Sequence, residues 1–371
     1  MSEIKNHKKL FIPGPTEVRK EILEEMSHHM IGHRTEEFSS LFGQIKPKLQ
    51  RLFYTQNDVL VSTSSGSGFM EAAIRNCVSK KVINCVCGAF SQKWYKIALS
   101  CGKQASKIEV EYGKAIKPQM VDEALKTGEY DAVCVTHCET STGLFNPIEE
   151  ISEIVKKYPD VLFLVDAVSS MGGTKIEVDK LGIDICLASV QKAMALPSGL
   201  SVASVSQKAY ERAKTIDSRG YYFDLLELQK TYEKNQTPYT PSISHLYALR
   251  KQLDYIVDEE GLENRFKRHR QMADFVRNWA VENEMKMFSE LGYESDTVSC
   301  ISNTKGFDLK SIKQELLNKG YLADTGYRTL NEKLTQEGKP TTFRIAHMGD
   351  MQMTDIQDYL NEIETIFKRG K

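Results

Sequence analysis

The chain lacks the features that mark secreted, membrane and nucleic-acid-binding proteins. Its N-terminus, MSEIKNHKKLFIPGP, is polar and has no apolar run of the kind that a signal peptide needs. No stretch approaches the ~20 apolar residues that cross a bilayer. The 49 basic and 50 acidic residues almost cancel, so the basic excess that attracts nucleic acids and anionic membranes is missing. We therefore expect a cytoplasmic protein with neither kind of partner.

Metal and redox motifs are missing as well. Cys85 and Cys87 are too close in sequence for a CxxC redox pair, and no second pair exists to complete a zinc site. Cys134 and Cys186 lie inside apolar runs, where a free cysteine behaves as a small hydrophobe. The sequence therefore predicts buried free thiols and no metal site.

Alternating strand and helix patterns occupy residues 57–206. The apolar runs are almost continuous, which is typical of strands covered by helices on both faces. The alternation predicts an α/β domain with a mostly parallel sheet. The expected strands are 58–62, 81–87, 132–136, 161–166, 183–188 and 200–206.

The pattern changes after about residue 255. A long helical stretch (261–284) leads to shorter strand candidates and a closing amphipathic helix, which predicts a smaller α+β domain. The 371 residues suggest two domains more than one. We expect an N-terminal segment near the active site, a large domain and a small C-terminal domain, at residues 1–20, 21–255 and 256–371.

Two helix starts carry capping signals. Asn146 is expected to be an N-cap, followed by Pro147 at the first helical position and by a capping-box acid, Glu149. Thr354 and Gln357 are expected to form the capping box of the closing helix.

A glycine-rich turn, Ser64-Ser65-Gly66-Ser67-Gly68, lies between a strand and the helical run FMEAAIRN. Backbone N–H groups and the helix dipole converge on an anion in this arrangement. The turn matches neither GxxxxGK[ST] nor GxGxxG, which disfavours a nucleoside triphosphate or a dinucleotide. An ordinary flexible turn is the alternative.

Two charged residues follow strands at the same expected edge of the sheet. Asp166 ends the strand at 161–166, and Lys192 follows the strand at 183–188. α/β proteins bind ligands at this carboxyl edge. A helix N-cap is the alternative for Asp166, and an exposed loop charge is the alternative for Lys192.

The turn, the aspartate and the lysine together meet the needs of pyridoxal 5′-phosphate. This cofactor needs an anion cradle for its phosphate, a lysine for its aldehyde and a carboxylate opposite its ring nitrogen. The carboxylate keeps the ring protonated, because an opposite charge nearby favours the charged form.

Longer motifs along almost the whole chain form a joint pattern: PGPT (13–16), SSGSGFMEA (64–72), THCETSTG (136–143), VDAVSS (165–170), SVQKA (189–193) and FRIAHMG (343–349). With this pattern the chain resembles the class V aminotransferases of the fold-type I pyridoxal-phosphate enzymes. It is most similar to the alanine–glyoxylate, serine–pyruvate and serine–glyoxylate aminotransferase group. The resemblance implies transfer of an amino group from alanine or serine to glyoxylate or pyruvate in ping-pong steps.

The resemblance also implies cofactor-binding roles. Lys192 matches the lysine that holds the cofactor as a Schiff base, and Asp166 matches the partner of its ring nitrogen. Phe90 falls where the family places an aromatic that stacks on the ring, often Trp; core packing is the alternative. Further contacts are implied for the phosphate loop, for the residue before the lysine and for a hydrogen-bond partner of the ring hydroxyl: Ser65, Gly66, Ser67, Gln191 and Ser141.

Substrate and partner contacts follow from the same resemblance. Arg344 matches the arginine that binds the substrate carboxylate, for which a guanidinium offers a bidentate fork. A salt bridge between domains is the alternative. The backbone N–H of Gly14 is expected at the same carboxylate. Thr240 matches a threonine that reaches the phosphate of the neighbouring subunit, which implies a homodimer with shared active sites.

Two other functions stay open on the same fold. A cysteine desulfurase or related lyase needs a nucleophilic cysteine in the small-domain half, but the loop 326–342 has none and the last cysteine is Cys300. Such enzymes usually carry His before the lysine, where this chain has Gln191. A non-catalytic, regulatory cofactor-binding protein would usually have lost the lysine or the aspartate.

Overall fold

A seven-stranded sheet forms the centre of the computed structural model, which describes residues 7–369. β10 is antiparallel to both of its neighbours, and the other neighbouring strands run parallel. The predicted α/β class and all six predicted strands are confirmed. The sheet order is β2 (Asp58–Ser62), β10 (Ser201–Val205), β9 (Ile185–Ser189), β8 (Leu162–Asp166), β5 (Ala132–Thr136), β3 (Lys81–Val86) and β4 (Gln104–Glu109).

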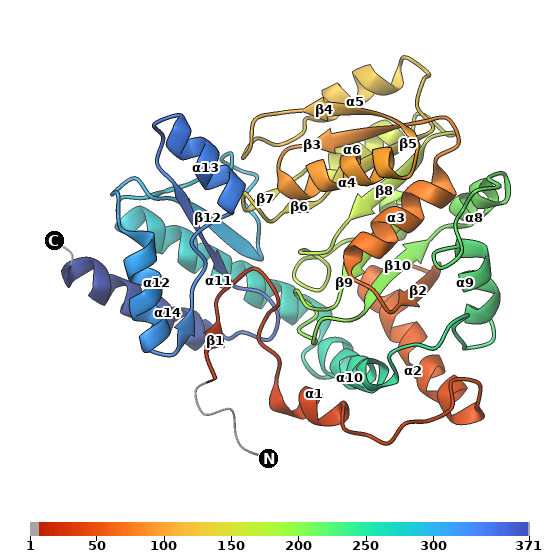
Figure 1. The fold of residues 1–371 in the computed structure, drawn as a ribbon, viewed down its shortest axis with the longest axis horizontal. Helices are drawn as coiled ribbons and strands as arrows, with labels where there is room; N and C mark the ends of the chain where they lie inside the picture. Colours follow the sequence, from red (N-terminus) through yellow and green to blue (C-terminus); the bar gives the residue numbers. More distant parts are fainter. Residues whose placement is uncertain (1–6, 370–371) are drawn as a thin grey trace.

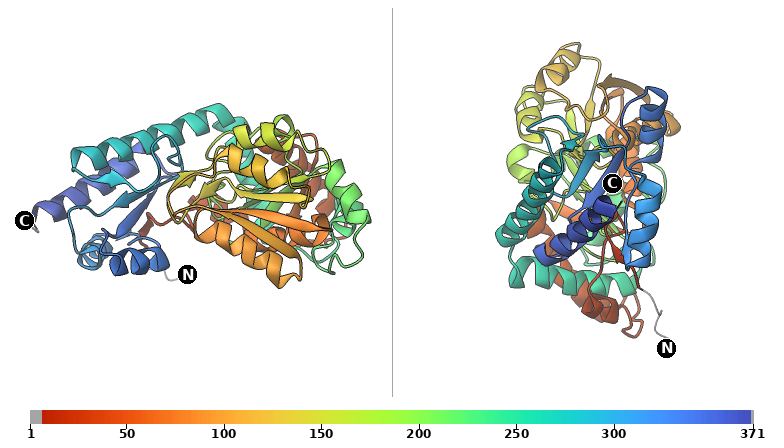
Figure 2. Two further views of the ribbon diagram at one scale, coloured as in Figure 1. Left: turned by 90° about the horizontal axis from the view of Figure 1, so that it is seen from above. Right: turned by 90° about the vertical axis from the view of Figure 1, so that its left-hand side faces the viewer.

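Helices lie on both faces of this sheet. Figure 2 (left) shows α3 and α4 on one face and α5 and α6 on the other. The strands between them are buried along nearly their whole length, as their apolar sequences require. The helices of this part are α1 (Lys20–Glu25), α2 (Glu36–Phe53), α3 (Gly66–Cys77), α4 (Ala89–Ser100), α5 (Pro118–Leu125), α6 (Ile148–Val155), α7 (Val178–Leu181), α8 (Gln207–Lys214), α9 (Leu225–Tyr232) and α10 (Ile243–Leu253).

A smaller α+β unit lies beside the large sheet (Figure 1). It is reached through a π-helix, η1 (Asp254–Glu259), and the long α11 (Leu262–Glu282). Among residues 7–369, no helix has the length and apolarity needed to span a membrane. The remaining elements are a three-stranded antiparallel sheet of β11 (Lys286–Met287), β12 (Val298–Ser302) and β14 (Thr342–Ala346), the helices α12 (Leu309–Asn318), α13 (Arg328–Gln336) and α14 (Met353–Arg369), the parallel pair β1 (Lys9–Leu10) and β13 (Tyr321–Leu322), and the hairpin β6 (Cys138–Glu139) and β7 (Leu144–Phe145).

Two large hydrophobic cores divide the molecule. One consists of buried residues between Ile22 and Val257. The other consists of buried residues between Met272 and Phe367, together with Phe11. We propose on this basis a large domain at 21–255, a small domain at 256–371 and a separate N-terminal segment at 1–20. Residues 1–6 and 370–371 of this division lie outside the part that the structure describes.

Both predicted capping signals are wrong. Helix α6 begins at Ile148 with Pro147 as its N-cap, because the Asn146 amide instead binds the backbone of Ile116 and Thr136 at 2.8 and 2.7 Å. Helix α14 begins at Met353, one residue before the expected cap Thr354.

Candidate active site

The sheet topology brings the expected site residues to one edge. Since β10 is antiparallel to both β2 and β9, β2 runs in the same direction as β9, β8, β5 and β3. The carboxyl ends of these strands open onto a cavity of ≈ 310 Å³. Eight of the eleven predicted site residues line it: Gly14, Ser65, Gly66, Ser67, Phe90, Asp166, Gln191 and Lys192.

One end of the cavity is the N-terminus of α3. Within residues 7–369, no protein acceptor takes the N–H groups of Gly66 and Ser67, whereas Gly68 N–H binds the Ser65 carbonyl at 2.8 Å. A Cβ on Gly66 would lie 2.6 Å from Val168 Cγ2, so a larger residue would push this turn away from β8. Free N–H groups at a helix N-terminus favour an anion.

Asp166 contributes a buried carboxylate. One of its oxygens accepts a hydrogen bond from Val168 N–H at 2.8 Å, and the other lies 3.5 Å from the Thr136 hydroxyl. Burial, together with the nearby charge of Glu139, raises the pKa of Asp166 to about 7. A cationic group on a ligand would favour its ionised form.

Lys192 lies in the same cavity beside the N-terminal segment. Burial, together with the charge of Arg344, lowers the pKa of Lys192 to about 8. Its ammonium group donates a hydrogen bond to the Pro13 carbonyl. Gly14, at φ +136°, has no side chain, and a Cβ there would collide with the lysine side chain. The amine therefore lies in the cavity and is more easily deprotonated than an ordinary lysine.

The loop that carries Lys192 is held from outside by three donors. Thr16 N–H donates to the Gln191 carbonyl at 3.1 Å, and the Thr16 hydroxyl donates to the Lys192 carbonyl at 3.0 Å. Arg265 donates to the Ala193 carbonyl at 2.6 Å. The N-terminal segment and α11 therefore fix the backbone on both sides of the lysine.

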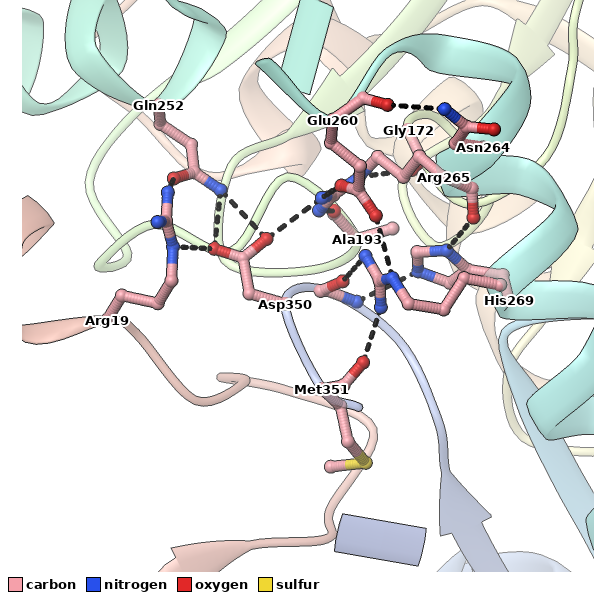
Figure 3. A network of polar contacts seen from close by, with 12 residues as sticks. Arg19, Gly172, Ala193, Gln252, Glu260, Asn264, Arg265, His269, Asp350 and Met351 are labelled. Atoms are coloured by element: carbon pink, nitrogen blue, oxygen red, sulfur yellow. Dashed lines mark hydrogen bonds and ion pairs between the residues drawn. The ribbon is translucent and has the colours of Figure 1, made fainter. Parts of the chain in front are cut away.

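Arg265 belongs to a buried ionic network (Figure 3). It has no exposed surface and forms ion pairs with Glu260 at 2.6 Å and Asp350 at 2.9 Å. Asp350 also accepts hydrogen bonds from Arg19 at 2.7 Å and Gln252 at 2.9 Å. These contacts connect the N-terminal segment, α10, α11 and the loop before α14 around the Lys192 backbone.

Glu139 on β6 is fully buried, and its carboxylate holds both Phe90, at the start of α4, and Ser141. The Glu139 carboxylate accepts hydrogen bonds from the N–H groups of Phe90 and Ser91. The Ser141 hydroxyl donates to Glu139 at 2.6 Å and accepts from Ala89 N–H at 3.1 Å. Phe90 therefore lines the cavity, whereas Ser141 is buried behind it.

Arg344 lies on β14, outside the residues that line the cavity. Its Nε and Nη2 donate to the two carboxylate oxygens of Asp324 at 2.9 Å each, and its Nη1 donates to the Thr140 carbonyl at 3.1 Å. Arg344 and Asp324 both lie in the smaller α+β unit, so this salt bridge is internal to that unit and is not the bridge between domains that the sequence left as an alternative. A guanidinium has five N–H donors, so one donor on Nη1 and one on Nη2 have no protein acceptor among residues 7–369.

Thr240 also lies outside the cavity. It is exposed and lines a separate small pocket with Thr63 and Tyr222.

Sequence reasoning missed six residues that line the cavity. Thr140 and Ser169 lie in motifs that the sequence analysis used, but a motif does not show which of its side chains point inward. Lys93 follows Phe90 by three residues, a spacing that places both on one face of α4. The missed residues are Met70, Lys93, Cys138, Thr140, Val168 and Ser169.

The protein has a mostly parallel α/β sheet, and at one edge of it a helix N-terminus, a buried carboxylate and a lysine of lowered pKa line one cavity. Residues 10–359 match the family Aminotransferase class-V, and the chain belongs to this family. It is 41% identical to an uncharacterised aminotransferase of Methanocaldococcus jannaschii, over 92% of this chain and 88% of the relative. It is 32% identical to a serine–glyoxylate aminotransferase of Methylorubrum extorquens, over 94% and 87% of the two chains.

The structural likeness agrees with this family. An alanine–glyoxylate aminotransferase from Nostoc sp. superposes with a TM-score of 0.90 at 25% identity, over 98% of this chain and 96% of that one. The resemblance that the motifs indicated is thereby confirmed at the level of the family.

Proposed function

We propose that this protein is a pyridoxal-phosphate-dependent transaminase. It transfers the amino group of a small α-amino acid, alanine or serine, to glyoxylate or pyruvate. One observation carries the proposal: Lys192, Asp166 and the free N–H groups of α3 line the same cavity. The names of the serine–glyoxylate and alanine–glyoxylate relatives support this choice of substrates.

The residues present fit the cofactor. Lys192 would hold its aldehyde, Asp166 its ring nitrogen and the turn at Ser65–Ser67 its phosphate, while Phe90 lies where it can stack on the ring. The bound cofactor supplies an electron sink that stabilises negative charge at the substrate's α-carbon. A cationic ring nitrogen would pair with the buried Asp166 carboxylate and lower its raised pKa.

The chain's own groups then position the substrate and move its proton. The two N–H donors of Arg344 without a protein acceptor would bind the two oxygens of an α-carboxylate, while Asp324 holds the other edge of the guanidinium in place. Once released from the cofactor, Lys192 carries a proton away from the substrate's α-carbon as a general base. Its pKa of about 8 suits that task near neutral pH.

We also propose that the enzyme is a homodimer in which Thr240 contacts the cofactor phosphate of the partner subunit. Two observations support this: Thr240 is exposed, and it lines a pocket beside the segment that leads into the phosphate turn. Closed two-fold dimers are also the commonest assembly of soluble enzymes.

The desulfurase alternative is less well supported. It requires a mobile, reactive thiol, but Cys138 and Cys300 are buried, and burial raises the pKa of each thiol to about 12. The regulatory alternative would predict loss of Lys192 or Asp166, and both are present.

The test traps the cofactor and screens substrates. Purified protein with pyridoxal phosphate should become yellow, and borohydride followed by peptide mapping should place the adduct on Lys192. The same preparation should transfer amino groups from alanine or serine to glyoxylate or pyruvate. Lys192→Ala should give no adduct at this position and no transfer. Trapping on another lysine would reject the site, and trapping on Lys192 without any transfer would reject the activity.

A further inference from the structure

Two cationic side chains line the cavity, Lys93 and Lys192. In the proposed function, Lys192 binds the aldehyde of the cofactor. It leaves Lys93, on α4, without an assigned role.

The position of Lys93 directs it toward the anion end of the cavity. Its ammonium nitrogen lies 3.4 Å from the hydroxyl of Ser67, which is in the first turn of α3. The same nitrogen lies 5.5 Å from the centre of the Phe90 ring, within range of a cation–π contact. Lys93 thus extends from the aromatic wall to the helix N-terminus.

The charge balance at this end calls for a cation. A bound phosphate monoester carries about −1.5 to −2 charges near neutral pH. The helix N-terminus supplies the equivalent of about half a positive charge, and the serine hydroxyls and free N–H groups are formally neutral. Arg344 has its guanidinium paired with Asp324 on β14 and does not line the cavity. Lys93 is therefore the cavity-lining cation available to balance the phosphate.

We propose that Lys93 binds the phosphate of the cofactor and supplies its counter-charge, in addition to the helix N-terminus. This inference rests on the proposed function, because it assumes that pyridoxal phosphate is the ligand. The contact with Ser67 favours the phosphate over a second carboxylate on the substrate. Lys93 would be a cofactor-binding residue that takes no part in proton transfer.

The test compares a phosphorylated ligand with an unphosphorylated one. Absorbance titration of cofactor-free protein gives Kd for pyridoxal phosphate and for pyridoxal, which differ in the phosphate alone. Lys93→Met should weaken pyridoxal phosphate about 10-fold, the lower end of what a charge-assisted hydrogen bond contributes. It should leave pyridoxal unchanged. Lys93→Arg should keep most of the affinity, and the loss in Lys93→Met should shrink at high salt.

Lys96→Met is the matched control, because Lys96 is an exposed lysine one turn further along α4 and does not line the cavity. Equal weakening of both ligands by Lys93→Met would overturn the inference, since it would show an effect on the ring or the fold. Unchanged affinity for pyridoxal phosphate, with a higher KM for aspartate but not for alanine, would assign Lys93 to a substrate carboxylate instead. If the parent protein binds neither ligand, the proposed function fails and the role of Lys93 fails with it.

Discussion

Protonation of Lys192 is set by its surroundings, and this determines when it can react. Burial disfavours the charged amine, and the positive charge of Arg344 adds to the effect, which gives a pKa of about 8. At one pH unit below that value only about a tenth of the amine is neutral. The neutral amine is the form that attacks an aldehyde.

We therefore predict that cofactor-free protein captures pyridoxal phosphate faster as pH rises toward about 8 and at a constant rate above it. Stopped-flow absorbance measures this profile. Arg344→Met should move the profile to higher pH, because it removes the charge that lowers the pKa of Lys192. An inflection at the ordinary lysine value of 10.5 in the parent protein would show that the cavity does not tune this amine.

Arg344 forms a salt bridge with Asp324, and we propose that it also binds the substrate. In the proposed function, the salt bridge with Asp324 would orient the guanidinium, and the two N–H donors without a protein acceptor would bind the substrate carboxylate. Arg344→Ala should lower kcat/KM by about 10²- to 10⁴-fold for every α-amino acid donor, since each donor has the same carboxylate. Steady-state kinetics with several donors measures the loss.

A donor amine without a carboxylate is the control for Arg344→Ala and should be little affected. Arg344→Lys should recover part of the loss, because a point charge cannot form the parallel pair of hydrogen bonds. A loss confined to one donor would instead assign Arg344 to the side-chain pocket. Loss of bound cofactor would assign it to the fold.

The sequence predicted those site residues whose place in the fold is set by the strand next to them in the chain. Asp166 ends a buried strand, Lys192 and the turn at Ser65–Ser67 each follow one, and sheet topology brings these strand ends together. The inward direction of Lys93 depends on the rotation of α4. Ser141 is buried through its hydrogen bond to Glu139, and this tertiary contact cannot be read from the sequence.

At the scale of elements, apolar strands were predictable and polar ones were not. β4 reads QASKIE, lies at the sheet edge and has no buried residue, so no continuous apolar run reveals it in the sequence. The start of α6 was missed for a different reason. Asn146 is a residue type that often caps helices, but its side-chain amide is hydrogen-bonded instead to Thr136 on β5 and to Ile116 before α5.

The ionic network links elements whose sequences give no sign of the link. Arg265 on α11 contacts the Lys192 loop, while its charge is balanced by Glu260 and by Asp350, which precedes α14. Removing one partner from such a group leaves buried charges uncompensated.

Arg265→Met should therefore lower the free energy of unfolding by about 3–5 kcal/mol. Urea denaturation, read from the shift in midpoint at constant slope, measures the change. Arg270→Met is the matched control on the same helix: its side chain is 60% exposed, and its pairs with Asp274 and Asp296 should contribute about 1 kcal/mol or less. Equal losses in the two variants would mean that the network contributes no more than a surface ion pair.

At the scale of the whole molecule, an exposed aromatic group lies next to Thr240. Tyr221 is 82% exposed, and the rings of Tyr222 and Tyr239 stack with their centres 4.8 Å apart. Aromatic side chains are enriched at the centres of protein interfaces. This surface is therefore where we expect the second copy to bind, which would bring Thr240 to the cavity of that copy.

Thr240→Ala should then weaken binding of pyridoxal phosphate about 5-fold, because the lost hydroxyl contributes roughly 1 kcal/mol to the phosphate. It should leave pyridoxal unaffected. Thr127→Ala, at an exposed threonine on the loop after α5, should change neither value. Tyr221→Glu should dissociate the dimer in sedimentation and reproduce the Thr240→Ala loss, because the hydroxyl reaches the phosphate only from the other subunit. If Tyr221→Glu yields a monomer that binds pyridoxal phosphate as tightly as the parent, the shared site is rejected even where Thr240→Ala weakens binding, since Thr240 would then act within its own chain.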